Sequence, residues 1–524
     1  MRDLGINDGH ALDKINRKDT TLSNEAPATM NFQPSARAIP RKAILAVALT
    51  VLLSGCQMVP TDTGSFMPSS NPVTVDSVTR GNRLARLARQ QHPRILQTYG
   101  GEYSDPKLER MVAKVVGSLT LDEQNTGAAY TVTILNSPNV NAFALPGGYL
   151  YVTRGLLALA NDSAELAAVI AHEMAHVTAN HGIERQKLEA QEKFASKVVS
   201  EVIDGRDQAA QAALVRGKLR LAQFSRNQEL EADRLGIRTT THAGYDAFAA
   251  ARFLQAMDAY QGFRSVSGAT DASLDFLASH PNAPRRIELA QRHAREMQQP
   301  DAAGKRDRDS FLAGIDGMIY GDSPEEGYVR GRDFLHPGLG VAFQVPEGFI
   351  IDNSTKAVTA VGPDDIAVRF DGATVPQRTS LTDYLTSGWV AGLEPETIRT
   401  FTINGYPAAK GRASADGWQF DVTVIRSGGQ VYRLLTAAPA TSNDLERVAN
   451  SVGQSFRILN QAERAALKPL RVRVVTVQPG ETLGSLAAQM RGVDRKVELF
   501  RLLNALGPGA TPSAGSKVKI VTDR

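Results

Sequence analysis

Cysteine is almost missing from this chain, whose 524 residues include a single one, Cys56. One thiol excludes an internal disulfide framework, a cysteine zinc finger and an iron–sulfur cluster. An excess of one charge is missing as well, because 59 Lys and Arg face 55 Asp and Glu. A net charge of +4 over this length, without a dense basic run, argues against nucleic acid as a partner. Metal chemistry in this chain would therefore depend on histidine and carboxylate ligands.

Long apolar runs are also missing. No run after residue 56 could cross a membrane, and residues 43–53 are too short to do so as a mature helix. An Arg-Lys pair precedes residues 43–53, as in a secretory signal. The sequence Leu-Ser-Gly-Cys that ends at Cys56 resembles the lipobox of bacterial lipoproteins. The resemblance implies that Cys56 is lipidated and anchors the protein to a membrane. Gln57 in place of Asp favours the outer membrane, whereas an ordinary cleaved signal with an incidental cysteine is the alternative.

The signal region, residues 1–56, is longer than such leaders usually are. Met30 would begin a leader of ordinary length before Cys56. We therefore expect residues 1–29 to come from a mis-assigned start.

The length, about three times that of a typical domain, predicts an α+β multidomain protein with two to four domains. The composition, 42% apolar and 22% charged, is that of globular proteins. Helical periodicity dominates the first domain, with one strand-like stretch, and alternating strands dominate the second. The predicted segments are a signal region (1–56), a flexible tether (57–80), a mostly helical domain with a small sheet (81–298), a linker (299–332), a small α+β accessory domain (333–457), a second linker (458–470) and a βααβ module (471–524).

A metal-binding pattern lies in the helical domain, where His172-Glu-Met-Ala-His176 has the form H-E-x-x-H. On a helix, residues i and i+4 share one face, so both imidazoles can reach the same ion. Glu173 then lies beside the metal, where it can take a proton from water. Asp162 and Glu165 form a capping pattern at the start of this helix. The alternative, solvated histidines on a helix surface, is disfavoured by the apolar neighbours.

A catalytic zinc usually keeps three protein ligands and one open position, so a carboxylate is the natural third ligand. Glu229 and Asp233 lie one helical turn apart. One can bind the metal while the other hydrogen-bonds a ligating imidazole and fixes its tautomer. Glu231 turns about 200° from Glu229, which predicts a surface or packing contact. His181 turns about 140° from the face of His176, which predicts a polar residue at the helix end. A charge run on a solvated helix is the alternative reading of residues 229–233.

Taken together, these segments resemble the M48 (Ste24-type) zinc metallopeptidases. The resemblance covers residues 85–298 and rests on residues 141–156, 172–176, Ser225-Arg226 and Glu229-Leu-Glu-Ala-Asp233. It implies a mostly helical zincin domain of the gluzincin type with one Zn²⁺ per chain. The implied zinc ligands are His172, His176 and Glu229, with Glu173 as the catalytic base and Asp233 behind the ligands. It also implies that the strand stretch at 141–153 borders the cleft, where an extended peptide can add to its edge.

A second segment resembles soluble periplasmic members of the same family, namely Ser279-His280-Pro281 with Arg286 after it. In those proteins a histidine can occupy the open metal position as a gate, which implies this role for His280. A structural histidine beside a proline is the alternative. The oxyanion of a reacting peptide needs a further electrophile, for which Tyr245, His280 and Arg286 are candidates.

The C-terminal module resembles a LysM domain, a small βααβ unit that binds glycans. The resemblance rests on residues 472–477, the turn Gln478-Pro-Gly-Glu-Thr-Leu483, Asn504 and a closing strand at 517–521. It implies peptidoglycan as a partner for residues 471–524, and a βααβ cap without a glycan site is the alternative.

These predictions describe a zinc-dependent endopeptidase of the bacterial cell envelope that degrades misfolded or misassembled envelope proteins. Binding along an edge strand reads the backbone more than side chains, which suits unfolded or extended substrates. The alternative is a peptidoglycan-associated chaperone or scaffold that uses the same fold with little proteolysis. A purely structural metal is disfavoured, because structural zinc normally has four closed ligands that are often cysteines.

Overall fold

The computed structural model describes residues 83–121, 130–202, 208–267, 276, 280–281, 284–298, 303–355 and 357–524. The predicted signal region (1–56), with the alternative start at Met30 and the lipidation site Cys56, and the predicted tether (57–80) lie outside these residues. Helices and sheets are mixed along the chain, in agreement with the α+β prediction. Among the helices of these described ranges, none has both the length and the apolarity needed to cross a bilayer.

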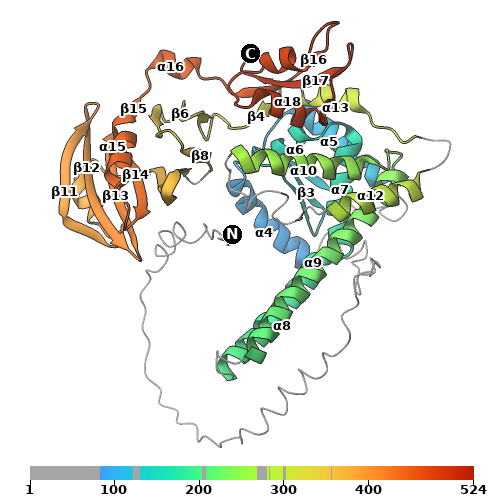
Figure 1. Ribbon diagram of the computed structural model, residues 1–524, viewed down its shortest axis with the longest axis horizontal. Coiled ribbons are helices and arrows are strands. Elements are labelled where there is room, and N and C mark those ends of the chain that lie inside the picture. Colours follow the sequence, from blue (N-terminus) through green and yellow to red (C-terminus); the bar gives the residue numbers. More distant parts are fainter. Residues whose placement is uncertain are drawn as a thin grey trace, which may run out of the picture. The chain divides into compact units, whose positions relative to one another are not determined.

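The first part of the chain combines helices with a three-stranded sheet (Figure 1). Its elements are α4 (Arg83–Thr98), α5 (Pro106–Leu119), β1 (Thr131–Leu135), β2 (Ala142–Leu145), β3 (Tyr149–Thr153), α6 (Arg154–Leu159), α7 (Ser163–Thr178), α8 (His181–Val202), α9 (Gln208–His242), α10 (Ala249–Ser267) and α12 (Pro284–Met297). Strand β3 lies in the centre, parallel to β1 and antiparallel to β2. Strand β2 is therefore an edge strand within the described part of the chain.

Helix α7 carries the predicted metal motif and is buried along nearly its whole length. At its start, the Asp162 carboxylate accepts the Glu165 N–H at 2.8 Å, and the Glu165 carboxylate accepts the Asn161 N–H at 2.8 Å. These bonds satisfy N–H groups that have no partner within the helix, which confirms the predicted start. Helices α5, α9 and α10 and strand β2 all pack against α7. A helix enclosed by neighbours needs apolar residues on every side, and α7 has them.

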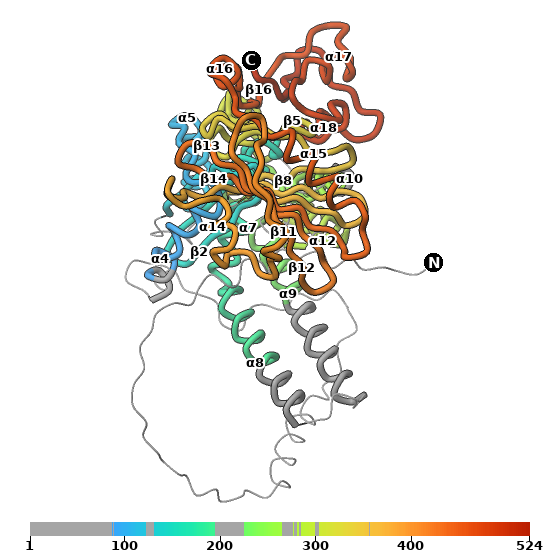
Figure 2. The backbone as a smooth tube through the Cα atoms, turned by 90° about the vertical axis from the view of Figure 1, so that its left-hand side faces the viewer, coloured from blue at the N-terminus to red at the C-terminus, as the bar shows by residue number. Residues whose placement is uncertain are grey.

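The chain turns sharply between α7 and α8. Helix α7 ends at Thr178, and Asn180 has a φ of 61°, in the left-handed region that asparagine tolerates better than most residues. Helix α8 starts at the next residue, His181. It then lies side by side with α9 as a helical hairpin (Figures 1 and 2). Helix α9 therefore packs directly on α7 and also on α8.

Residues 303–332 contain a helix and two short strands where the composition predicts a linker. We predicted a linker over residues 299–332, and this prediction is wrong for the described residues of the segment. Helix α13 (Arg308–Ile315) buries three apolar side chains in the main core, those of Phe311, Leu312 and Ile315. Two short strands follow, β4 (Ile319–Tyr320) and β5 (Tyr328–Arg330). The charged residues around these few apolar positions gave the segment the composition of a linker.

The accessory domain is built on two antiparallel sheets. Its elements are β6 (Asp333–His336), β7 (Val341–Gln344), β8 (Ile350–Asn353), β9 (Val358–Val361), the 3₁₀ turn η2 (Pro363–Asp365), β10 (Ala367–Thr374), α14 (Leu381–Leu385), β11 (Leu393–Ile403), β12 (Tyr406–Ala415), β13 (Trp418–Ser427), β14 (Gln430–Pro439), α15 (Leu445–Ser455), β15 (Arg457–Ile458) and α16 (Gln461–Ala466). One sheet has the order β11-β12-β13-β14-β10-β9-β8 and the other β15-β7-β6-β5. Val424 and Ile425 are neighbours on β13 yet belong to different hydrophobic clusters, because successive side chains point to opposite faces of a sheet.

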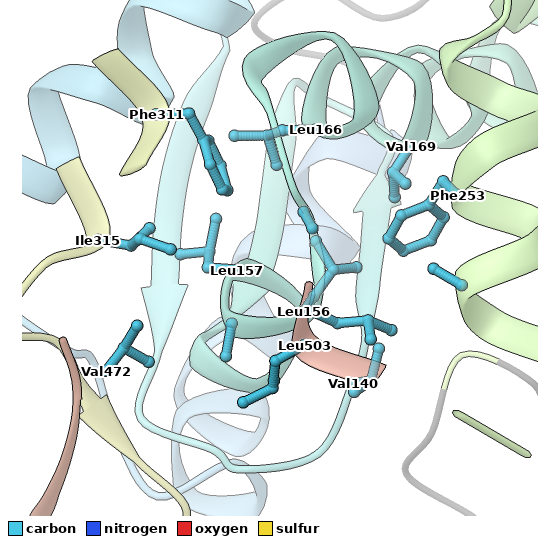
Figure 3. Close-up of a cluster of buried hydrophobic side chains, with 14 of the residues drawn as sticks. Val140, Leu156, Leu157, Leu166, Val169, Phe253, Phe311, Ile315, Val472 and Leu503 are labelled. Atoms are coloured by element: carbon cyan, nitrogen blue, oxygen red, sulfur yellow. The ribbon is translucent and has the colours of Figure 1, made fainter. Parts of the chain in front are cut away.

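The C-terminal module follows the predicted βααβ order and shares the core of the helical domain. Its elements are β16 (Leu470–Thr476), α17 (Leu483–Ala488), α18 (Lys496–Leu503) and β17 (Lys517–Thr522). Strands β16 and β17 pair antiparallel, and β4 extends their sheet. Val472 and Leu503 of the module lie in one hydrophobic cluster with Leu157 and Ile315 (Figure 3). The module therefore packs as part of the helical domain.

Candidate active site

Four side chains converge where α7, α9 and the segment before α12 meet. Nε2 of His172 lies 3.0 Å from Nε2 of His176, and 3.4 Å from Nδ1 of His280. Nδ1 of His280 lies 3.1 Å from both carboxylate oxygens of Glu229. The Glu229 carboxylate also lies 3.5 Å from Nε2 of His172 and 3.5 Å from Nε2 of His176. Within the described residues, these four form the group of side chains able to hold one metal ion.

The four donors fit a zinc ion. Zinc bonds of ~2.0–2.1 Å to nitrogen and oxygen give a tetrahedron with edges of about 3.3 Å. The separations of 3.0, 3.1, 3.4 and 3.5 Å between donor atoms match such edges. Imidazole and carboxylate are ligands that zinc prefers. His280 would then be a fourth ligand, at the position that a catalytic zinc site otherwise leaves to water or substrate.

Glu173 lies next to this group but outside it. Its side chain is 4% exposed, and its Oε1 lies 3.5 Å from Nε2 of His280. Within the described residues, Oε1 has no hydrogen-bond partner. Burial raises the pKa of Glu173 above its ordinary value, while the nearby His280 and His172 oppose this rise. A buried carboxylate with a free oxygen and a raised pKa is suited to accept a proton.

Asp233 and Arg286 hold the ligands from behind. Oδ1 of Asp233 lies 3.0 Å from Nδ1 of His172, and both Asp233 oxygens accept hydrogen bonds of 2.8 Å from Arg286. Nη1 of Arg286 also lies 3.0 Å from the Glu229 carboxylate. Burial alone would raise the pKa of Asp233, but the ion pair with Arg286 outweighs it and the pKa falls to about 2. Asp233 is therefore ionised at neutral pH and can keep the proton of His172 on Nδ1.

Two of the oxyanion candidates are engaged in other contacts in the structure. Tyr245 is 1% exposed; its hydroxyl is hydrogen-bonded to Ser118, and Lys305 lies 4.2 Å from its ring centre. These neighbours include none of the four metal-binding side chains, and an oxyanion role for Tyr245 stays a prediction. Arg286 is near the metal ligands, but its nitrogens donate to Asp233, Glu229 and the carbonyl of Pro281. Arg286 therefore supports the ligands, and His280 is the candidate that reaches the site.

His181 and Glu231 lie behind the metal ligands, whereas helical angles predicted a helix-end residue and a surface or packing contact. Nδ1 of His181 lies 2.9 Å from Nδ1 of His176, and Nε2 of His181 lies 3.3 Å from the Glu231 carboxylate. The angle of about 140° holds only if one helix runs unbroken from His176 to His181, and α7 ends between them at Thr178. The left-handed turn at Asn180 ends that helix and returns His181 to the side of His176. An H-x-x-x-x-H spacing across a residue tolerant of this turn was the available signal.

The edge strand β2 lies against the helix that carries the metal motif. Within the described residues β2 pairs only with β3, which leaves its second edge without a strand neighbour. Just before β2, the carbonyl of Val140 accepts the backbone N–H of Phe276 at 2.9 Å. The Phe276 ring in turn stacks on His280, with ring centres 4.4 Å apart. Phe276 therefore contacts both the backbone just before β2 and the ring of His280.

Comparison with known families agrees with this geometry. Residues 102–294 match Peptidase family M48, and this range contains all four metal-binding side chains and Glu173. These residues are an M48 domain. The predicted resemblance is therefore confirmed. Peptidase family M48 consists of zinc metallopeptidases, and the M48 domain of this chain has a His/Glu group that can hold the ion.

Curated relatives of the M48 domain come from bacteria and mitochondria. The chain is 28% identical to the "Mitochondrial metalloendopeptidase OMA1" of Schizosaccharomyces pombe, over 38% of this chain and 58% of the relative. It is 30% identical to the "Putative beta-barrel assembly-enhancing protease" of Vibrio cholerae, over 35% and 38%. It is 27% identical to the "Beta-barrel assembly-enhancing protease" of Yersinia pestis, over 39% and 42%. The chain thus spans less than two thirds of each of these relatives.

Proposed function

We propose that this protein is a zinc-dependent endopeptidase of the bacterial cell envelope that degrades misfolded or misassembled envelope proteins. One observation carries the proposal: the buried Glu173 carboxylate, with a free oxygen, lies beside a group of four zinc donors inside an M48 domain. A scaffold would gain nothing from this arrangement, because burying a carboxylate oxygen that accepts no hydrogen bond costs free energy. The partner we propose is the water that attacks the peptide bond.

The chain's own residues carry most of the proposed chemistry. Bound zinc would supply a Lewis acid that polarises the scissile carbonyl and makes water more acidic. Glu173 accepts the proton of the attacking water at Oε1 and returns it to the leaving amine. His172, His176 and Glu229 are the residues that would hold the ion. His280 has to leave the fourth position before a substrate can enter, which makes it the proposed gate.

The proposed substrates are extended protein segments. The second edge of β2 has no strand neighbour among the described residues, and a peptide could add there as a further strand, with backbone hydrogen bonds as the main contacts. A folded protein keeps its strands paired, so unfolded or misassembled chains would be preferred. The names of the Vibrio and Yersinia relatives refer to β-barrel assembly, which agrees with an envelope role.

Two further partners belong to the proposal. The lipobox-like sequence at Cys56 would attach the protein to a membrane, and the residue after it favours the outer membrane. Residues 471–524 would bind peptidoglycan. In support, the turn at 478–482 and the loop at 505–517 are largely exposed, whereas the apolar side chains of the strands and helices of the module pack in the core. A glycan could therefore reach the module without disturbing its packing.

The test compares the chain from Gln57 onward, which keeps every described residue, with its Glu173→Gln variant. Both are loaded with zinc and offered an unfolded protein. We expect equal zinc content and a loss of hydrolysis in the variant of at least about 100-fold, the size of a general-base contribution.

A second variant separates gating from inactivity. His280→Ala should increase hydrolysis if His280 closes the site, and Glu173→Gln in that background should abolish the increase. If wild-type protein and His280→Ala both bind zinc and neither cleaves, the endopeptidase proposal is wrong. The chaperone or scaffold alternative would then be the better account.

A further inference from the structure

The second histidine ligand has a hydrogen-bonded chain behind it. Nδ1 of His176 lies 2.9 Å from Nδ1 of His181, and Nε2 of His181 lies 3.3 Å from Oε2 of Glu231. The planes of the His176 and His181 rings make an angle of 75°, and the ring centres lie 4.9 Å apart. His181 is 2% exposed and Glu231 is 6% exposed. The two side chains behind His176 are therefore buried, whereas His176 itself is partly exposed.

The three side chains of this hydrogen-bonded series come from three different helices that pack on one another. His176 lies on α7, His181 is the first residue of α8, and Glu231 lies on α9. Helix α9 turns Glu229 and Asp233 towards the histidines of α7, and it turns Glu231 towards α8. The backbone of His181 is held as well, because its carbonyl accepts the side-chain N–H of Gln228 at 2.9 Å.

Metal binding leaves one arrangement of protons for this chain. A neutral imidazole that offers the lone pair of Nε2 to a metal carries its proton on Nδ1. The Nδ1–H of His176 then donates to Nδ1 of His181, which places the proton of His181 on Nε2. That N–H donates to the Glu231 carboxylate. Each donor meets an acceptor, and the last acceptor is an anion.

The two histidine ligands are therefore supported in different ways. His172 has its carboxylate, Asp233, in direct contact at 3.0 Å. His176 has its carboxylate one imidazole away. We infer that His181 and Glu231 are positioning residues that fix the tautomer and orientation of His176 for metal binding. The inference rests on the metal site of the proposed function, and it does not depend on peptide hydrolysis.

The test measures the zinc affinity of the full chain by competition with a chromophoric chelator, and the absorption spectrum of the Co²⁺-loaded protein. His181→Leu removes the acceptor and should weaken zinc binding about 10- to 100-fold, the usual effect of losing such support. It should also change the Co²⁺ bands, since the orientation of one ligand changes. His181→Asn keeps an acceptor near the position of Nδ1 and should recover part of the affinity.

A matched control separates the effect of the His176–His181–Glu231 hydrogen bonds on zinc binding from a general loss of stability where α8 begins. Gln228→Met removes the bond to the His181 carbonyl but leaves all three side chains of the chain intact. It should lower the melting temperature without changing zinc affinity. The inference is overturned if His181→Leu binds zinc like wild type, or if Gln228→Met weakens zinc binding equally. Should His181→Leu not fold, Glu231→Leu, which removes the terminal acceptor, gives the same two readouts. Wild type that binds zinc without cleaving would contradict the proposed function alone.

Discussion

Nδ1 of His172 lies 3.0 Å from Oδ1 of Asp233. The same carboxylate accepts two hydrogen bonds of 2.8 Å from the guanidinium of Arg286, which also contacts Glu229. One buried aspartate therefore joins a histidine ligand to an arginine, and the arginine joins it to the carboxylate ligand. Metal affinity and stability should depend on the same contact.

Replacement of Asp233 by Asn should reduce both properties. The amide keeps the shape of the side chain, but it leaves the buried Arg286 with one anionic partner in place of two. Breaking a buried ion pair costs about 3–5 kcal/mol, and loss of support for a ligating histidine costs about 10- to 100-fold in metal affinity. Denaturant unfolding of the zinc-free protein and chelator competition of the loaded protein measure the two effects.

The double variant Asp233→Asn with Arg286→Met tells these effects apart. Removing the unpaired charge should restore part of the stability, because no buried cation is left with too few partners. The zinc affinity should stay low, since His172 still lacks its anion. Recovery of affinity together with stability would show that Asp233 acts through folding alone.

The sequence predicts the site where local geometry determines it. His172, Glu173 and His176 follow from helical spacing, and Glu229 and Asp233 from the same spacing on a second helix. His181 and Glu231 could not be placed in this way, because their meeting depends on where α7 ends and on how α8 packs on α9. The position of His280 came from a family resemblance, since no spacing relates it to α7.

The fold shows the same division. Alternation of apolar and polar residues predicts the strand-rich character of the accessory domain, whereas it predicts neither α13 nor the packing of the C-terminal module. A few apolar side chains within a charged segment become core only when a distant strand, here β16, covers them. Such burial is a tertiary effect that composition cannot report.

Glu326 should make stability fall as pH rises. Burial raises its pKa to about 7, with Asp322 adding to the rise and Arg154 opposing it. The native protein therefore binds a proton between about pH 4.5 and 7 that the unfolded chain has released. Its stabilising contribution is complete below about pH 4.5 and is lost as pH rises through 7. The loss should reach about 3 kcal/mol.

Glu326→Gln mimics the protonated group and should be more stable than wild type at pH 8 and equal to it at pH 4.5. Melting temperatures across this range test the difference between the two proteins, which cancels the contribution of other groups. The neighbouring Glu325 is exposed and adds the smallest contribution to the raised pKa of Glu326, so Glu325→Gln is the comparison variant and should move the curve in the same direction but far less. Parallel curves for Glu326→Gln and wild type would contradict the prediction.

Lys519 should decide whether the C-terminal module and the M48 domain unfold together. Its side chain is 0% exposed, and Nζ donates to the carbonyls of Ala158, Leu159 and Ala160 at 2.8, 3.2 and 2.6 Å. These carbonyls end α6, just before the helix of the metal motif, and a helix cannot satisfy its last carbonyls itself. Lys519→Met keeps the length of the side chain and leaves three buried acceptors without this donor. We expect a loss of about 3 kcal/mol or more.

Lys517 on the same strand offers a matched control. It is exposed, and its ion pair with Asp309 at 3.1 Å is exposed as well. Lys517→Met should therefore change stability by less than about 0.5 kcal/mol. If the core is shared, Lys519→Met shifts one cooperative transition in which far-UV circular dichroism and zinc release change together. Loss of the module at a lower denaturant concentration, with zinc still bound, would mean that it is an independent domain, because the M48 domain would then keep its metal site without the contacts of Lys519.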